Sequence, residues 1–276
     1  MTQTIKHTAR SFFVAAFLST AALAANGTLS LVSSGTGDLD NMTLKAYKTI
    51  KEADIIFTMR GEAGKFEELI GTKPIYPAGH ALFSKNAKHK WMKLKNDKGE
   101  SIKKSAEEIE KIEEEYRKLI RSNIKEGKNI AIIDNGDPSI YGPHIHFVQE
   151  FKDLHPQVIP GISSFNAANA ALQRSVIGGS QGALGVSLTV GNSQNKLIEK
   201  LAPTGSTMVF FMDRKFEDFI AHLAKHYKKD TGIAIVMNAG DSKQERVVFG
   251  SLQDITTKIT HEKIPFNHLI YVGDFL

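Results

Sequence analysis

Short apolar runs, each followed by a turn-forming segment and then an amphipathic stretch, recur along the chain. The clearest lies within residues 129–143, where Ile130-Ala-Ile-Ile133 precedes a turn with Gly136 and Pro138. A run that is apolar at every position is expected for a strand covered on both faces in a parallel sheet. The glycine and proline predict a tight turn at the carboxyl end of that strand, where open α/β sheets bind ligands. An ordinary strand-to-helix turn is the alternative interpretation.

The first part of the chain carries the same pattern. A glycine-rich turn and a helical repeat are flanked by two apolar runs, which span residues 28–34 and 54–58. In the helical repeat, Leu44, Tyr47 and Ile50 are three residues apart and predict one apolar face. Strand, turn, helix and strand form a βαβ unit, which predicts parallel strands. Two further elements are predicted, a helix over 62–70 and a strand near 74–76.

Residues 84–128 differ in composition from the rest of the chain. Lysines dominate the first part of this segment, and an acidic helix follows, in which Ser105 and Glu108 have the spacing of a capping box. The apolar residues of this helix fall on one face: Ile109, Ile112, Tyr116, Leu119 and Ile120. We expect a solvated helical insertion whose basic and acidic halves neutralise each other. A basic flap over an acidic substrate is the alternative.

The second half of the chain also alternates between strand and helix patterns. Strands are predicted at 157–159, 185–190, 207–212, 232–238, 246–249 and 268–272. Helices are predicted at 165–172, 194–201, 216–227 and 252–259. Because the pattern restarts near His155 without a long linker, we place a domain boundary there. The predicted fold is α/β, with an N-terminal domain over residues 25–155 and a C-terminal domain over 156–276.

The N-terminal segment has the three parts of a secretory signal peptide. Lys6 and Arg10 give a positive start, an apolar run follows over residues 12–23, and Ala22-Leu23-Ala24 ends it with small residues. We predict a signal peptide over residues 1–24, cleaved after Ala24, and hence an exported, periplasmic protein. The run is shorter than the ~20 residues of a membrane-spanning helix, and no later stretch qualifies. The alternative is an N-terminal helix of a cytoplasmic protein.

Composition narrows the classes of function. The chain has 276 residues, of which 41% are hydrophobic and 24% charged, which is typical of a globular protein large enough for two cores. The formal net charge of +5, partly contributed by the leader, is too small to indicate a nucleic-acid partner. Cysteine is absent, which excludes a disulfide framework and a thiolate site.

Three groups of residues are candidates for binding or chemistry. Gly35-Thr-Gly-Asp38 follows the first strand and opens a helix, so its backbone N–H groups suit an anionic or polar ligand. This turn lacks the third glycine of a dinucleotide-binding fingerprint. The pairs His144/His146 and His222/His226 have spacings that a metal site could use, but neither has a third ligand nearby in sequence. We therefore expect polar surface or cleft histidines and no metal.

Six segments taken together resemble the tetrapyrrole methylase family, whose S-adenosylmethionine-dependent members methylate precorrins, cobalt-precorrins and uroporphyrinogen. The resemblance extends from Thr28 to the C-terminus. The segments that carry it are Ser34-Gly-Thr-Gly-Asp-Leu-Asp-Asn-Met-Thr-Leu-Lys-Ala46, Lys51-Glu-Ala-Asp-Ile-Ile56, Asn135-Gly-Asp-Pro-Ser-Ile-Tyr-Gly142, Val158-Ile-Pro-Gly-Ile-Ser-Ser164, Thr207-Met-Val-Phe-Phe-Met212 and Gln244-Glu-Arg-Val-Val-Phe-Gly-Ser-Leu252. One such motif would be weak, whereas six in the same order are specific.

The resemblance implies a two-domain, usually dimeric protein with mixed, largely parallel sheets. The methyl donor would bind in the cleft between the domains, and the macrocycle in a trough of the first domain. Matching positions assign these residues to the cofactor: Thr36, Asn135, Gly136, Asp137, Ile140, Ser163, Ser164, Met212 and Ala239. Gly136 would allow close approach, and Met212 would supply a soft apolar wall.

The chain departs from the family pattern at positions that handle protons. Members of the uroporphyrinogen type carry an acid after the second strand, where this chain has Thr58-Met59, and a lysine where it has His80. Thr36 also replaces the usual proline. His80 and Asp38 are the remaining candidates for catalytic proton transfer.

The resulting prediction is an S-adenosylmethionine-dependent C-methyltransferase acting on a tetrapyrrole. Because S-adenosylmethionine is made in the cytoplasm, the predicted leader favours an alternative: an exported, non-catalytic tetrapyrrole-binding protein that retains the fold. An RNA-modifying enzyme is the third possibility, which the modest charge and the Gly-Asp-Pro loop disfavour.

Overall fold

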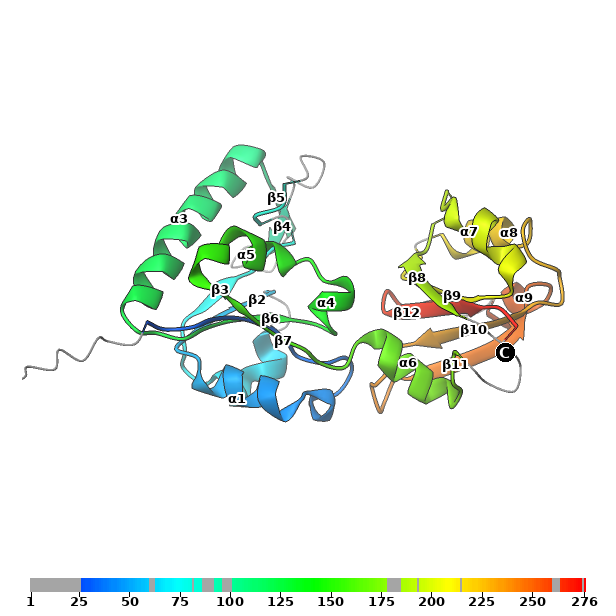
Figure 1. Ribbon diagram of the computed structural model, residues 1–276, viewed down its shortest axis with the longest axis horizontal. Coiled ribbons are helices and arrows are strands. Elements are labelled where there is room, and N and C mark those ends of the chain that lie inside the picture. The colour runs from blue at the N-terminus through cyan, green and yellow to red at the C-terminus, as the bar shows by residue number, and fades with distance from the viewer. Residues whose placement is uncertain are drawn as a thin grey trace, which may run out of the picture.

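The computed structural model forms two lobes, each built on one five-stranded sheet, with α6 (Ser164–Leu172) between them (Figure 1). It describes residues 26–59, 63–80, 82–85, 92–95, 101–177, 185–192, 194–213, 215–259, 264–274 and 276. The predicted leader, residues 1–24, lies outside the described residues. We call residues 26–159 the first lobe and residues 164–276 the second lobe.

The sheet of the first lobe is parallel throughout, as predicted. Its order is β3-β2-β6-β1-β7, and its strands are β1 (Leu29–Ser33), β2 (Ile55–Thr58), β3 (Ile75–Pro77), β6 (Ile130–Asp134) and β7 (Gln157–Ile159). Every residue of β1, β2 and β6 is buried, which explains why their sequences do not alternate. Because the strands run the same way, the loops after β1, β2, β3 and β6 meet at one edge, here called the carboxyl edge.

The predicted domain boundary at residues 155/156 is too early. β7 pairs with β1, with Val158 opposite Leu31, and therefore completes the first sheet. The chain leaves this sheet after Ile159 and begins α6 at Ser164. The strand that restarts the pattern near His155 is the last strand of the first lobe. The sequence placed the boundary before it, because a strand pattern does not reveal which sheet the strand joins.

Helices cover both faces of the first sheet. The elements between the strands are η1 (Leu39–Asn41), α1 (Leu44–Glu52), η2 (Ala63–Phe66), α2 (Glu67–Ile70), α3 (Ala106–Lys125), α4 (Pro138–Tyr141), α5 (Ile145–Glu150) and η4 (Lys152–Leu154). On one face, α1 and α2 enclose a core that includes Val32, Ile56 and Ile133. On the other face, α3 and α5 pack over Phe57 and Ile132 (Figure 1).

The apolar face predicted for α1 is wrong at two of its three positions. Leu44 is 79% exposed and Tyr47 is 46% exposed, whereas Ala46 and Ile50 are fully buried. Residues four apart lie on the same side of a helix, and this helix turns its 46/50 side toward the sheet. The small Ala46 is what allows the helix to lie close to β1 and β6.

The helix of the 84–128 segment is part of the first core and not a solvated insertion, so that expectation is wrong for α3. Its capping box is confirmed, with Ser105 Oγ accepting from Glu108 N–H. The predicted apolar positions face the core: Ile109, Tyr116 and Ile120 are buried, and Ile112 and Leu119 pack against them. The lysine-rich part forms a β-hairpin of β4 (Met92–Lys95) and β5 (Ser101–Lys104), whose linking residues lie outside the described ones.

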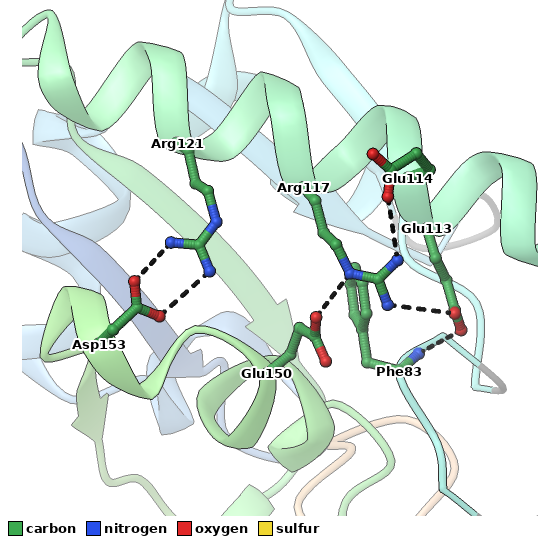
Figure 2. Close-up of polar contacts among 7 residues, drawn as sticks. All are labelled: Phe83, Glu113, Glu114, Arg117, Arg121, Glu150 and Asp153. Carbon is green, nitrogen blue, oxygen red and sulfur yellow. Dashed lines mark hydrogen bonds and ion pairs between the residues drawn. The ribbon is translucent and has the colours of Figure 1, made fainter.

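Two arginines tie α3 to the segment containing α5 and η4 (Figure 2). Arg117 Nε donates to Glu150 at 2.6 Å, and the two terminal guanidinium nitrogens of Arg121 donate to the carboxylate of Asp153, at 2.5 and 3.1 Å. The Arg121–Asp153 pair is exposed and the Arg117–Glu150 pair is partly buried. An exposed ion pair contributes little to stability, so the Arg121–Asp153 contact mainly orients the helix.

The sheet of the second lobe is mixed. Its order is β11-β10-β12-β9-β8, with β8 (Val186–Val190), β9 (Thr207–Phe211), β10 (Gly232–Met237), β11 (Arg246–Ser251) and β12 (His268–Val272). Only the β8–β9 pair is parallel among these strands. One face is covered by α6, and the other by α7 (Leu197–Leu201), η5 (Ala202–Thr204), α8 (Phe216–Leu223) and α9 (Ile255–Ile259). Within the part of the chain that the structure describes, no helix has the length and apolar character needed to cross a membrane.

Candidate functional site

Two loops, one from each lobe, are hydrogen-bonded to each other in a contact that we call the clasp. It joins residues 36–41, which follow β1, to residues 239–242, which follow β10. Asp38 N–H donates to the Gly240 carbonyl at 2.9 Å, and Ser242 N–H donates to the Asp38 carboxylate at 2.9 Å. The turn that the sequence identified as a ligand loop therefore also connects the lobes.

Close backbone approach in the clasp explains its glycines. A Cβ on Gly37 would lie 2.0 Å from the carbonyl carbon of Gly240, and Gly37 has a φ of +70°. The amide of Asn41 donates to the carbonyls of both Thr36 and Gly240, at 2.9 Å each. Any side chain at position 37 would push the loops apart, so the clasp requires glycine there.

A cavity of about 430 Å³ opens beside the clasp. It is lined from both lobes by Thr36, Gly37, Asp38, Leu39, Lys65, Asn135, Asn238, Ala239, Asp241 and Asn267. This volume lies within the range of roughly 300–1,000 Å³ found for small-molecule sites. Four of the predicted site residues are among the lining: Thr36, Asp38, Asn135 and Ala239.

The loop after β6 adjoins this cavity and contacts β1. Gly136 has a φ of +70°, and its N–H donates to the Gly35 carbonyl at 2.8 Å, while Ser33 Oγ donates to the Gly136 carbonyl. A Cβ on Gly136 would meet only Ser164 N, at 3.9 Å, so this side of the loop is open. Gly136 thus presents bare backbone next to the start of α6, as a ligand-binding loop would.

Two other predicted residues of this loop lie outside the cavity lining. The Asp137 carboxylate caps α4, accepting from Ser139 N–H at 2.8 Å and from Ser139 Oγ at 2.6 Å. Ile140 is 50% exposed. The Asp137 carboxylate therefore stabilises the start of α4, and any contact with a cofactor would be made in addition to these hydrogen bonds.

The predicted serines and methionine lie at the junction of the two lobes, also outside the cavity lining. Ser163 caps α6: its Oγ accepts from Asn166 N–H at 3.3 Å and donates to Asn166 Oδ1 at 2.7 Å. Ser164 is the first residue of α6. Met212 follows β9 with a φ of +43° and packs in the α6 core.

An aromatic stack connects the loop after β6 to the end of β9. The rings of Tyr141 and Phe211 are 5.3 Å apart and inclined by 19°. Since Phe211 directly precedes Met212, the stack brings that methionine toward the loop that carries Gly136. The structure thus gathers the predicted cofactor residues around the interlobe junction, with some in the cavity wall and others beside it.

The Asp38 carboxylate is held in its ionised form. Its hydrogen bonds with Ser242 lower its pKa below the ordinary value of 3.8, and the positive charges of Lys65 and Lys243 act in the same direction. Lys65 Nζ also donates to the Gly37 carbonyl at 2.6 Å. A carboxylate with a lowered pKa is a weak base, so Asp38 is better suited to holding the clasp than to accepting a proton.

A second cluster lies at the carboxyl edge of the first sheet, and we call it the histidine rim: Met59, His80, Asp134 and His144. His80 Nε2 lies 2.8 Å from Met59 Sδ, and the rings of His80 and His144 meet edge to face with centroids 6.1 Å apart. Asp134 and His144 are 4% and 1% exposed, and Asp134 Oδ1 lies 3.2 Å from His144 Nδ1. His144 Nε2 is within hydrogen-bond distance of the Ala78 carbonyl, at 3.1 Å.

His80 is held in its neutral form near neutral pH. Although part of the side chain reaches solvent, burial of the ring lowers its pKa below the ordinary 6.5. The neighbouring His144 lowers the pKa further, while Asp134 opposes the shift. A neutral imidazole offers a nitrogen lone pair to a proton or to a metal.

The sequence did not identify Asp134 and His144 as linked residues. The expectation of a surface or cleft histidine is wrong for His144, whose ring is buried. Asp134 binds it and also accepts from Asn135 N–H at 2.9 Å, so one carboxylate supports both the rim and the cavity wall. The sequence contained one indication of this pairing, since Asp134 ends an otherwise apolar strand and a buried carboxylate requires a partner.

Other lining residues were missed because they come from loops without a motif. Asn238, Asp241 and Asn267 belong to the second lobe, and Asn238 N–H donates to the Asn267 carbonyl at 2.8 Å. Their amides and carboxylate can serve the hydroxyls and ring nitrogens of a nucleoside. The lining, together with the open face of Gly136, therefore fits S-adenosylmethionine.

The histidines outside the rim do not form a metal site in the described residues. His222 and His226 lie with ring centroids 5.1 Å apart, and no third ligand joins them among the described residues. His146 Nδ1 is 3.4 Å from Gln149 Oε1. Nowhere in the described part of the chain do three or more His, Cys, Asp or Glu side chains gather in a way that could hold an ion.

Comparison with known proteins agrees with this architecture. Residues 28–256 match the pattern of the tetrapyrrole (corrin/porphyrin) methylases. A cobalt-precorrin-4 C(11)-methyltransferase of Methanocaldococcus jannaschii is 28% identical over 260 residues, which cover 91% of this chain and 89% of that protein.

Two solved structures share the fold. A cobalt precorrin-4 methyltransferase of cobalamin biosynthesis superposes with a TM-score of 0.66 at 18% identity, covering 89% of this chain and 94% of that one. A uroporphyrin-III C-methyltransferase from Thermus thermophilus, in complex with S-adenosylhomocysteine, gives 0.58 at 20% identity, covering 90% and 98%.

Proposed function

The chain belongs to the tetrapyrrole (corrin/porphyrin) methylase family, and from that membership we propose that it is an S-adenosylmethionine-dependent C-methyltransferase acting on a tetrapyrrole. The observation that carries the proposal is the cavity beside the clasp, which combines a bare-backbone loop at Gly136 with amide and carboxylate side chains from both lobes. A precorrin-like or uroporphyrinogen-like substrate would lie along the carboxyl edge of the first sheet, facing the histidine rim.

The protein's part in such a reaction is to position two reactants. S-adenosylmethionine supplies an electrophilic methyl group on a sulfonium. Asn135, Asn238 and Asn267 would orient the nucleoside, and the Asp38 and Asp241 carboxylates would favour the positive charge nearby. Fixing donor and acceptor carbon in line supplies most of what methyl transfer requires.

Of the two proton-transfer candidates, His80 is the better suited. It is neutral near pH 7 and reaches solvent at the rim, whereas Asp38 is ionised and bonded to Ser242. His80 would accept the proton that the macrocycle loses after methylation. Asp38 then becomes a positioning residue that holds the lobes together.

Calorimetry tests the cofactor assignment. We expect S-adenosylhomocysteine to bind the wild-type protein and not Asn135→Trp, because Asn135 is exposed and lines the cavity, so a larger side chain fills it without disturbing a core. Gln253→Trp is the matched control, because it is exposed at the other end of the second sheet, next to the end of β11. Unchanged affinity in Asn135→Trp would place the cofactor elsewhere.

An exported, non-catalytic tetrapyrrole-binding protein is the second candidate. Met59 and His80 stand where uroporphyrinogen-type members carry an acid and a lysine, and the predicted leader points to export. Under this proposal the chain would bind a tetrapyrrole with no affinity for S-adenosylhomocysteine, and the mature protein would start at Ala25. The same calorimetry, with a corrin or porphyrin as the second titrant, separates the two candidates.

The family resemblance also leads us to propose a homodimer. Leu44 and Tyr47 leave apolar surface on α1 at 79% and 46% exposure. Sedimentation analysis of the full chain tests this assembly, since a monomer at all concentrations would contradict it.

A further inference from the structure

Two side chains with metal-binding atoms converge at the histidine rim. Met59 follows β2 and His80 follows β3, and these strands are neighbours in the sheet. The two chain segments bring Met59 Sδ and His80 Nε2 to 2.8 Å from each other. Both are atoms that bind iron, cobalt or copper in proteins.

The contact between these atoms is weak enough to be exchanged for a better one. A thioether sulfur is a poor hydrogen-bond acceptor, so His80 gives up little when its nitrogen turns to another partner. His80 is also exposed, so that a ligand can reach it, while Met59 is only partly exposed. Partial burial of the ring and the neighbouring His144 lower the pKa of His80, so the imidazole is neutral near pH 7. When Nε2 binds a metal, the ring proton that faces Met59 Sδ moves to Nδ1, which leaves the lone pair on Nε2 for coordination.

These two donors do not suffice for a bare metal ion. A stable protein site for a bare ion has three or four ligands, and no group of three or more His, Cys, Asp or Glu side chains is placed to supply them in the described residues. A metal already held by the pyrrole nitrogens of a macrocycle, however, needs only an axial ligand. The rim has the donor set for that second case.

We propose that His80 Nε2 is the axial ligand for the central metal of a metallated tetrapyrrole, so that the site selects metal-bearing macrocycles over metal-free ones. The inference rests on the proposed function insofar as the ligand is a tetrapyrrole. It replaces the proton-accepting role considered for His80, because a ring nitrogen bound to a metal has no lone pair left for a proton. Met59 Sδ reaches the same point from the same side, so the two atoms do not bind opposite faces of one macrocycle. Instead, Met59 Sδ contacts His80 Nε2 when no metal is bound, and the metal replaces this contact.

The rim is connected to the methyl-donor cavity through Asp134. Its carboxylate contacts His144, whose ring lies against His80, and accepts from the N–H of Asn135 in the cavity wall. A macrocycle anchored through its metal at His80 is therefore fixed relative to the wall of that cavity. A metal–nitrogen bond fixes the position of the macrocycle relative to the methyl donor, whereas a hydrophobic trough alone would allow it to slide.

The test compares cobalt(II) uroporphyrin with metal-free uroporphyrin on the full chain. We expect the metallated form to bind about tenfold more tightly and its electron paramagnetic resonance spectrum to show nitrogen hyperfine splitting from one axial imidazole. His80→Ala should lose both the splitting and the preference, while Met59→Leu keeps both. His146→Ala is the matched control, since that histidine contacts Gln149 on α5 and should change neither.

Three outcomes would overturn the proposal. Equal affinity for the two macrocycles without imidazole splitting removes the ligand role but leaves the proposed function standing if S-adenosylhomocysteine still binds. Binding of cobalt(II) ions alone as tightly as the macrocycle would indicate a bare-ion site. Failure of either macrocycle to bind, in a protein that binds S-adenosylhomocysteine, would remove the tetrapyrrole from the proposed function and the inference with it. Circular dichroism checks that His80→Ala is folded.

Discussion

The clasp and the histidine rim lie at the same carboxyl edge of the first sheet, yet they are built from different parts of the chain. The clasp uses mainly backbone groups, with Asp38 N–H, the Gly240 carbonyl and the close approach of Gly37 at its centre. The rim uses side chains, above all His80 and Met59. The close backbone approach at Gly37 leaves no room for a side chain, whereas side chains at a rim can be exchanged without moving the strands. Under the proposed function, the methyl donor would have a fixed site and the acceptor an adaptable one.

The largest effect is expected from Gly37→Ala, which should break the clasp. The new Cβ would overlap the Gly240 carbonyl and the residue would keep a positive φ, so we expect a loss of about 2–4 kcal/mol in unfolding free energy. S-adenosylhomocysteine binding should be lost as well. Urea unfolding and calorimetry measure the two effects. Gly64→Ala is the control, because a Cβ there meets nothing within 4 Å; equal results for both variants would refute the clasp.

Asp134→Asn should weaken the histidine rim and the cavity wall together, because this carboxylate contacts His144 and Asn135. We expect a loss of about 1–3 kcal/mol in unfolding free energy, since the buried His144 loses a charged partner. Asp153→Asn serves as the comparison: it breaks the exposed pair with Arg121 and should barely move the urea midpoint (Figure 2). If the two variants behaved alike, Asp134 would not be the link between rim and cavity.

A change in pH should separate the two regions. As the pH is lowered from about 8, His80 is protonated once the pH passes below its lowered pKa, which lies under 6.5, and the lone pair is lost. Cobalt(II) uroporphyrin should then bind about tenfold more weakly. The clasp should not respond, because the pKa of Asp38 lies below 3.8 and its carboxylate stays ionised. Titrations with each ligand over a series of descending pH values measure this contrast, and a parallel loss of S-adenosylhomocysteine binding would contradict it.

Lys65→Met should have the smallest effect. Its Nζ donates to the Gly37 carbonyl from an exposed position, and contacts of this kind contribute little to stability. We expect S-adenosylhomocysteine to bind about threefold more weakly at most, with macrocycle binding unchanged. A loss as large as that of Gly37→Ala would show that a side chain, and not the backbone, holds the clasp.

Sequence reasoning predicted the parts of the molecule that depend on local pattern. The continuous apolar runs at Ile130 and in the neighbouring strands predicted the parallel sheet, and Ser105 with Glu108 predicted the start of α3. The glycines of the clasp and of the loop after β6 were recognised because turns with positive φ restrict the residue type. These features are set within a few residues of the chain.

The features that sequence reasoning missed depend on contacts between distant segments. The face that α1 buries is decided by the sheet beneath it, so Leu44 looked like a core residue and is exposed. The pairing of His144 with Asp134 joins the residue before α5 to the last residue of β6, and the contact of His80 with Met59 joins two loops. A carboxylate at the end of a buried strand hinted at a partner, but the identity of that partner required the fold.

The order of the strands has a consequence for the way the molecule is made. Since β7 completes the first sheet before the chain enters α6, all strands of that sheet have been synthesised once residue 159 has left the ribosome. Domains that are contiguous in sequence fold as units during synthesis, the N-terminal one first. The first lobe can therefore form while the second is still being translated, and the clasp closes only when residues 239–242 arrive. A nascent chain stalled before that point would have a finished histidine rim and no interlobe cavity.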